Sequence, residues 1–187
     1  MNNGWLGQLV EAVADGTALS NSTVETGILP AYCKWILDAG FFKRPGDEII
    51  VEASGRLSNI VTTPGTLTLR VKFGSIAVWD SGAIQLNAVA KTNVPWRLRV
   101  PLTCRAVGAT TAANLLGIGE FQSESVVGSP LPSAGGNGVL LVPVGAPAVG
   151  TGFDSTAAQT IDLTAAFSIA NAGNAIQCHQ FRLQSLN

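Results

Sequence analysis

Thr66-Leu-Thr-Leu-Arg-Val-Lys-Phe73 is the stretch of sequence that decides the fold. Every second residue in it is apolar, and the residues between are threonine, arginine or lysine. Successive side chains of a β-strand point to opposite faces, so a period of two is typical of a strand that is buried on one side only. The pattern predicts such a strand, with an inner face made of Leu67, Leu69, Val71 and Phe73.

A longer stretch, Val94 to Val107, repeats this alternation. Its even positions are apolar and are expected to face inward, while arginines and threonine occupy odd positions. Proline has no N–H to give to a strand ladder, and Pro95 and Pro101 both fall on the outward set. We therefore expect the ladder to be interrupted there by a sheet edge or a bulge. The inward set consists of Val94, Trp96, Leu98, Val100, Leu102, Cys104 and Ala106.

Turn sequences separate further strand candidates, among them Arg44-Pro-Gly-Asp47, Thr63-Pro-Gly65 and the loop Ser133–Gly138. Many short strands at this spacing predict an all-β fold, an antiparallel β-sandwich. A jelly roll is the arrangement that closes the edges of this number of strands. The further candidates are Tyr32–Leu37, Glu48–Leu57, Ile76–Leu86, Leu115–Val127, Gly138–Val144, Thr160–Leu163 and Ile176–Leu186.

The N-terminal residues allow two interpretations. Apolar side chains spaced three or four apart fit a short amphipathic helix. The alternative is an extended arm that docks on a neighbouring molecule. We expect residues 1–27 to form an N-terminal arm and residues 28–187 to form the jelly-roll sandwich. The residues with helical spacing are Trp5, Leu6, Leu9, Val10 and Val13.

The composition is poor in charge. Charged residues make up 12% of the 187 residues, against about 25% in ordinary soluble domains. We therefore expect the surface of the protein to be buried in an assembly or to be covered by neutral polar side chains. The net charge of −1 argues against a protein that binds nucleic acid by neutralising phosphates. No apolar run is long enough for a membrane helix, and no secretory signal is expected.

Residues suited to catalysis are scarce. The single histidine, His179, is expected to be a hydrogen-bonded structural residue, since a triad or a histidine pair cannot be built from it. Glu120 and Glu124 lie about 13 Å apart on an extended strand, too far for a glycosidase pair. The cysteines at 33, 104 and 178 are predicted to be small buried apolar residues. The sequence predicts neither an enzyme nor a cofactor or metal site.

Charge is distributed in blocks. Residues 1–55 contain seven acids and three bases, residues 56–105 contain seven bases and one acid, and Ser125–Phe153 contains no charged residue. If the two alternating strands pair, their outward bases share one face and form a basic patch. The acidic first 55 residues then complement it within a subunit or between neighbours; a solvated face and an acidic protein partner are the alternatives. The patch consists of Arg70, Lys72, Arg97, Arg99 and Arg105.

The order of these strands and turns resembles virion proteins of tailed bacteriophages that have a jelly-roll sandwich like that of tumour necrosis factor. The resemblance covers about residues 28–186. The motifs that carry it are Leu37-Asp-Ala-Gly-Phe-Phe42, Pro45-Gly-Asp-Glu-Ile49, Ala53-Ser-Gly-Arg-Leu-Ser58, Gly65-Thr-Leu-Thr-Leu-Arg-Val-Lys-Phe-Gly74, Trp96-Arg-Leu-Arg-Val100 and Cys104-Arg-Ala-Val-Gly108.

The resemblance implies a homotrimer in the virion, assembled in the host cytoplasm. It would act as a capsid decoration or cement protein bound to the major capsid protein, through the basic patch and the arm residues Trp5, Leu6 and Leu9. The alternative is a module of the tail or fibre whose loops, such as Ser129–Asn137, bind a host receptor or glycan. No direct contact with nucleic acid or membrane is expected. Residues expected to face the threefold axis are Ala165, Ala166, Phe167, Ile169, Ala172, Ala175 and Ile176.

Overall fold

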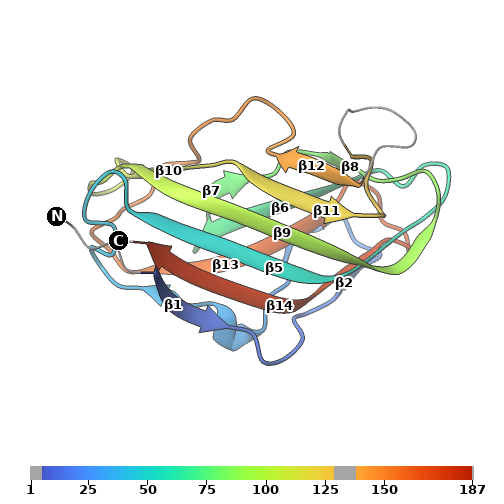
Figure 1. The fold of residues 1–187 in the computed structure, drawn as a ribbon, viewed down its shortest axis with the longest axis horizontal. Helices are drawn as coiled ribbons and strands as arrows, with labels where there is room; N and C mark the ends of the chain where they lie inside the picture. Colours follow the sequence, from blue (N-terminus) through green and yellow to red (C-terminus); the bar gives the residue numbers. More distant parts are fainter. Residues whose placement is uncertain (1–5, 129–137, 187) are drawn as a thin grey trace.

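Two antiparallel sheets pack face to face as a β-sandwich in the computed structural model, which describes residues 6–128 and 138–186. Figure 1 shows the larger sheet in front of the smaller one. The predicted all-β fold is confirmed. The described residues include one turn of 3₁₀ helix, η1 (Ala31–Cys33). No helix among them is long and apolar enough to cross a membrane.

The larger sheet has eight strands. Six of them lie side by side, and two short strands extend the pairing: β2 (Leu19–Ser20) pairs with β14, and β10 (Asn114–Gly117) pairs with β9. The six, in spatial order, are β1 (Leu6–Glu11), β14 (Ala175–Leu186), β5 (Glu48–Asn59), β9 (Lys91–Ala106), β11 (Gly119–Ser123) and β12 (Val139–Val142).

The smaller sheet has six strands. Its main path runs through four of them, while β4 (Ile36–Leu37) pairs with β13 and β8 (Ile84–Gln85) pairs with β6. The four, in spatial order, are β3 (Thr26–Gly27), β13 (Gln159–Phe167), β6 (Thr66–Phe73) and β7 (Ile76–Asp80).

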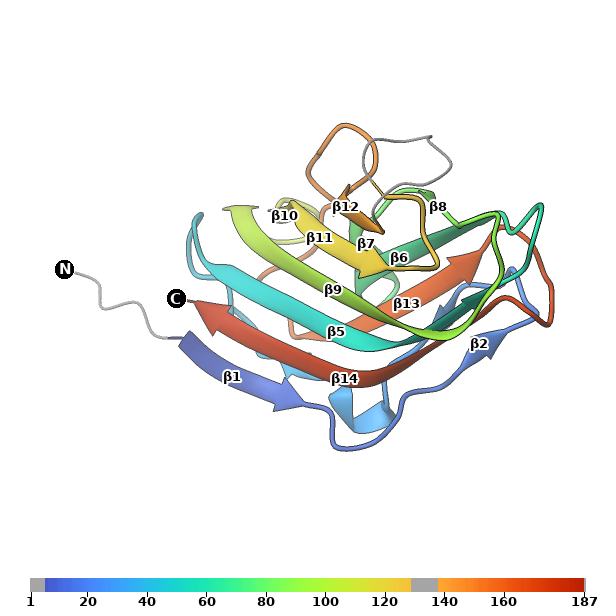
Figure 2. The same ribbon diagram turned by 45° about the vertical axis from the view of Figure 1, so that its right-hand side comes forward.

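The chain alternates between the sheets as a long hairpin folded over on itself. The first strands, β1 and β2, pair with the last, β14; β3 and β4 pair with β13; β5 pairs with β9; and β6 pairs with β7. This nested pairing across two sheets is the strand order of a jelly roll. Figure 2 shows β1 and β2 following β14 along its length.

Residues 6–27 are therefore part of the sandwich. The helix predicted near the N-terminus is wrong for Leu6–Glu11, which form strand β1 with a bulge between Gln8 and Val10. Without β1, one edge of β14 would present unpaired N–H and C=O groups, and an extended strand satisfies them where a helix cannot. The extended alternative has the observed conformation, but this arm docks on β14 of its own chain.

The core lies between the sheets and uses the predicted inner faces. Leu67, Leu69 and Val71 are fully buried. Phe73 and Phe153 pack edge to face with ring centroids 4.9 Å apart, a favoured geometry for aromatic pairs. The three cysteines are buried and unpaired, as predicted.

The prolines of β9 lie where one neighbouring strand is missing. On the β5 side, the ladder runs past both of them. On the other side, β10 ends with Gly117 opposite Leu102, and β11 pairs from Glu120, opposite Arg99. Pro101 falls in this gap, and Pro95 lies just beyond the last β11 pair. The predicted interruption is confirmed on that side. No described strand there presents a carbonyl group opposite either proline, so the lack of a proline N–H leaves no hydrogen bond unmade.

Candidate functional site

The five bases of the predicted basic patch do not share a face. Arg70 and Lys72 lie on β6 of the six-stranded sheet, whereas Arg97, Arg99 and Arg105 lie on β9 of the eight-stranded sheet. Their outward positions therefore lie on opposite surfaces of the sandwich. The prediction of one patch is wrong because β6 pairs with β13 and β7, while β9 pairs with β5 and β11.

On the six-stranded sheet, acidic side chains neutralise the bases. Glu25 lies 3.1 Å from Arg70 and 3.5 Å from Lys72, and Arg70 also contacts Asp80 at 2.6 Å. Thr164 Oγ1 donates a hydrogen bond to Glu25 Oε1 at 2.5 Å. Burial acts to raise the pKa of Glu25, but the Thr164 hydrogen bond and the charges of Lys72 and Arg70 outweigh it and lower the pKa.

On the eight-stranded sheet, charges of alternating sign form a row across five strands. The register aligns one residue from each of β1, β14, β5, β9 and β11. Arg182 contacts Glu11 at 3.3 Å, and Arg99 contacts Glu52 at 3.0 Å. Glu11 and Glu52, both from the first 55 residues, thus pair with bases of the same chain. The charged row consists of Glu11, Arg182, Glu52, Arg99 and Glu120.

The remaining predicted contact residues are scattered. Arg105 is exposed near the end of β9. Leu6 is exposed opposite Leu186 at the end of β1, whereas Leu9 packs partly against the core of its own chain. Trp5 and the loop Ser129–Asn137 lie outside the described residues. Among the described residues, these side chains are therefore not gathered into one docking surface, and their contacts with partners stay a prediction.

Two adjoining hollows lie on the outer face of the eight-stranded sheet. The larger has a volume of about 710 Å³ and the smaller about 360 Å³, which is the range of sites for small ligands. Both are lined by Ser54 of β5 and Arg97 of β9. The two hollows, together called the depression below, are lined from β1, β14, β5, β9, β11 and β12.

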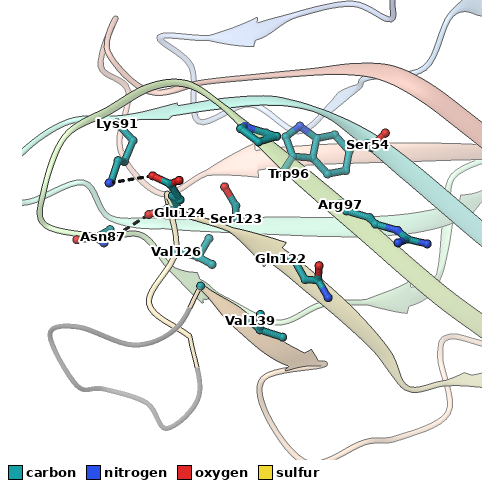
Figure 3. A pocket seen from close by; sticks show the side chains of 12 residues that line it. Ser54, Asn87, Lys91, Trp96, Arg97, Gln122, Ser123, Glu124, Val126 and Val139 are labelled. Carbon is teal, nitrogen blue, oxygen red and sulfur yellow. Dashed lines mark hydrogen bonds and ion pairs between the residues drawn. The ribbon is translucent and has the colours of Figure 1, made fainter.

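The larger hollow has a polar group at each end. Figure 3 shows Arg97 and Gln122 at one end and Lys91, Asn87 and Glu124 at the other. Lys91 Nζ lies 3.1 Å from Glu124 Oε2, and Asn87 donates to the backbone oxygen of Glu124 at 3.4 Å. Arg97 is 61% exposed and only 4.0 Å from Glu52. The depression offers hydrogen-bond donors and acceptors.

His179 of β14 contacts the N-terminal segment that contains Asp15. It occupies the irregular step of β14 between Cys178 and Gln180, and its Nδ1 lies 2.6 Å from Asp15 Oδ1. The segment containing Asp15 is also bound by Tyr32, whose hydroxyl accepts hydrogen bonds from the backbone N–H groups of residues 13 and 14. These contacts agree with the hydrogen-bonded role expected of His179. Within the described ranges, no group of His, Cys, Asp or Glu side chains is placed to hold a metal ion.

Sequence reasoning missed the neutral residues of the depression. Gln122 and Gln180 stand at outward positions of strands, so the alternation of their strands was a usable signal. Which outward residues share a row depends on strand order, which alternation does not give. The expected strand Tyr32–Leu37 is wrong at Trp35. This residue lies between η1 and β4, and it is 41% exposed.

The comparisons with known proteins find no relative. No protein-family model, no curated protein and no solved structure matches the chain.

Proposed function

We propose that this protein is a non-enzymatic structural protein of a bacteriophage virion, a homotrimer that decorates the capsid and reinforces it by binding the major capsid protein. The virion assignment rests on the resemblance of the strand and turn motifs. The jelly-roll strand order agrees with it. Self-association is supported by two exposed apolar surfaces, and these carry the proposal.

The first surface is an apolar corner made of Ile118, Val139 and Leu141. Register places Leu141 of β12 opposite Glu120 of β11, so Leu141 lies outward, diagonal to Ile118. Leu141 is 63% exposed. Val139 and Leu141 belong to the segment Ser125–Phe153, which has no charged residue. Exposed apolar side chains gathered in this way are typical of protein interaction sites.

The second surface is an opposite-edge patch made of Val13, Tyr32, Trp35 and Ile36, all exposed. Ile36 belongs to β4, which pairs with β13 on the side away from β6 and β7. The apolar corner lies on the β7 side, where Trp79 Nε1 donates to the Gly117 oxygen at 3.1 Å. The two surfaces therefore lie at opposite edges of the sandwich; Figures 1 and 2 show β12 and η1 far apart.

A ring of three subunits needs two different contact surfaces on each subunit. In a threefold assembly each contact joins two different surfaces, and repeated contacts close the ring. The apolar corner of one subunit would pack on the opposite-edge patch of the next. Three of the seven residues expected at the axis need correction: Ala165, Phe167 and Ile176 are buried in the core of their own subunit, so they are not available to a partner.

The test is light scattering of the purified protein and two charge variants. We expect a trimer at micromolar concentration, and monomers for Leu141→Glu and Ile36→Glu, because each places a charge in the contact without disturbing the core. Val61→Glu, at an exposed position of another loop, is the matched control and stays trimeric. A wild-type monomer at this concentration would overturn the proposed assembly. A virion reconstruction then tests for regular copies on the shell.

A second candidate function is a tail- or fibre-associated module that recognises a host receptor or glycan. The specific observation in its favour is the pair of adjoining hollows, the smaller of which is lined in part by Glu11, Glu52 and Arg182 of the charged row. A few copies at the tail tip in the reconstruction, instead of many on the shell, would favour this candidate over capsid decoration.

A further inference from the structure

A row of polar side chains crosses the outer face of the eight-stranded sheet beside the charged row. The register pairs Gln180 with Ser54, Ser54 with Arg97, and Arg97 with Gln122. We call these four residues the polar row; they come from β14, β5, β9 and β11. Neighbouring strands lie about 4.8 Å apart, so the row is about 14 Å long.

The polar row connects the two hollows. Gln180 lines the smaller hollow, Gln122 lines the larger, and Ser54 and Arg97 line both. Its members keep hydrogen-bonding capacity: Ser54 donates to Gln180 Oε1 at 2.8 Å, which leaves the amide N–H₂ of Gln180 as a donor. An extended ligand lying across the strands would meet donors and acceptors at each strand.

The charges around the row cancel. The lining residues supply three cations and three anions. Lys91 lies 3.1 Å from Glu124, Arg182 lies 3.3 Å from Glu11, and Arg97 lies 4.0 Å from Glu52, whose closer partner is Arg99 at 3.0 Å. A phosphate-rich or strongly acidic ligand would find no net positive potential here. An uncharged ligand rich in hydroxyl groups suits the site better, because each hydroxyl both donates and accepts a hydrogen bond.

Apolar surface borders the row as well. Pro95 lines the larger hollow, and it offers contact to the C–H face of a sugar ring. We propose that the polar row binds a neutral oligosaccharide lying across β14, β5, β9 and β11. This proposal rests on the recognition role, the second candidate function, and does not require the trimer.

The test is saturation-transfer NMR and calorimetry on the full chain with linear hexasaccharides of glucose, mannose and N-acetylglucosamine. We expect at least one to bind, and its affinity to fall about tenfold in Gln122→Ala and in Arg97→Ala. Matched controls are Gln184→Ala on β14 and Arg105→Ala on β9, which line neither hollow and keep wild-type affinity. Circular dichroism of each variant shows whether it is folded.

Two results overturn the proposal. One is no binding of any neutral hexasaccharide to the folded protein. The other is binding that the control variants weaken as much as the row variants, or that is confined to a sulfated hexasaccharide and lost with added salt. Saccharide binding decides this proposal, whereas light scattering and the virion reconstruction decide the proposed function, so the two fail separately.

Discussion

Glu25 collects more polar contacts than its position before β3 suggests. It accepts from Thr164 on β13 and pairs with Arg70 and Lys72 on β6. The segment carrying Glu25 is thereby fixed across the outer face of the six-stranded sheet. Because its pKa is lowered in the folded state, its ionised form stabilises the fold.

Glu25→Gln tests this contact. We expect a loss of about 1–2 kcal/mol in the free energy of unfolding at neutral pH, since charged hydrogen bonds in partly buried sites contribute about that much. A carboxyl group whose pKa is lowered by folding stabilises the folded state at pH values above its unfolded pKa of about 4.3. This stabilisation is lost as the pH falls through the pKa of the folded state. Urea unfolding at several pH values should therefore show the difference shrinking in acid. Glu120→Gln, an exposed change, is the control; an equal loss there would contradict the interpretation.

The thiol groups give a second prediction at this scale. The pKa of Cys178 is raised to about 12, mainly by burial and to a smaller extent by the neighbouring Cys33. Burial also raises the pKa of Cys33 and of Cys104. Only the thiolate reacts with disulfide reagents. We expect a chromogenic disulfide reagent to leave the native protein unmodified at mildly alkaline pH and to modify all three thiols in guanidinium chloride. Rapid labelling of the native chain would contradict this burial.

At the scale of elements, the close packing of β14, β5 and β9 against one another depends on Gly55. Trp96 Nε1 donates to the backbone oxygens of Arg56 and Gln177, at 3.2 and 3.1 Å. Gly55 lies opposite Trp96 in the register. A Cβ atom at Gly55 would overlap the Gln177 carbonyl oxygen, so a side chain is not accommodated there.

Gly55→Ala should therefore destabilise the sandwich. We expect a loss of about 3 kcal/mol, the upper part of the usual range for single substitutions, because backbone must move to relieve the overlap. Thermal unfolding followed by circular dichroism measures it. Gly145→Ala is the matched control, since nothing lies within 4 Å of the added Cβ and its melting temperature should not fall. Equal melting of the two variants would contradict the predicted role of Gly55.

At the scale of the whole molecule, the N-terminal strands complete both sheets. Removing residues 1–27 deletes β1, β2 and β3 and uncovers one side of β13 and β14. Free strand edges and exposed core favour aggregation. We expect this truncation to give insoluble or unfolded protein, and removal of residues 1–17 alone, which leaves β2 and β3, to give a folded protein with a lower melting temperature. A soluble truncation 28–187 with wild-type melting would show that the strands are dispensable.

The fold was largely predictable because local alternation records burial. The strands around Leu67 and Trp96 were found with their inner faces correct, since a period of two is a property of a single strand. The sequence leaves the N-terminal strand open between two alternatives: Leu6, Leu9 and Val13 fit helical spacing, and β14 decides for the extended form by supplying backbone partners.

The amino-acid sequence by itself determined the long alternating strands, which side of each of them is buried, and that few charges are available for the surface. Only the tertiary structure decided that Arg70 and Arg97 lie on opposite faces, that Glu25 and Glu52 neutralise bases, and that Gln180 and Gln122 join one row. The reason is physical. Burial of a strand depends on its own alternation, whereas the neighbours of a side chain on a sheet depend on strand order and register, which form between residues far apart in the chain.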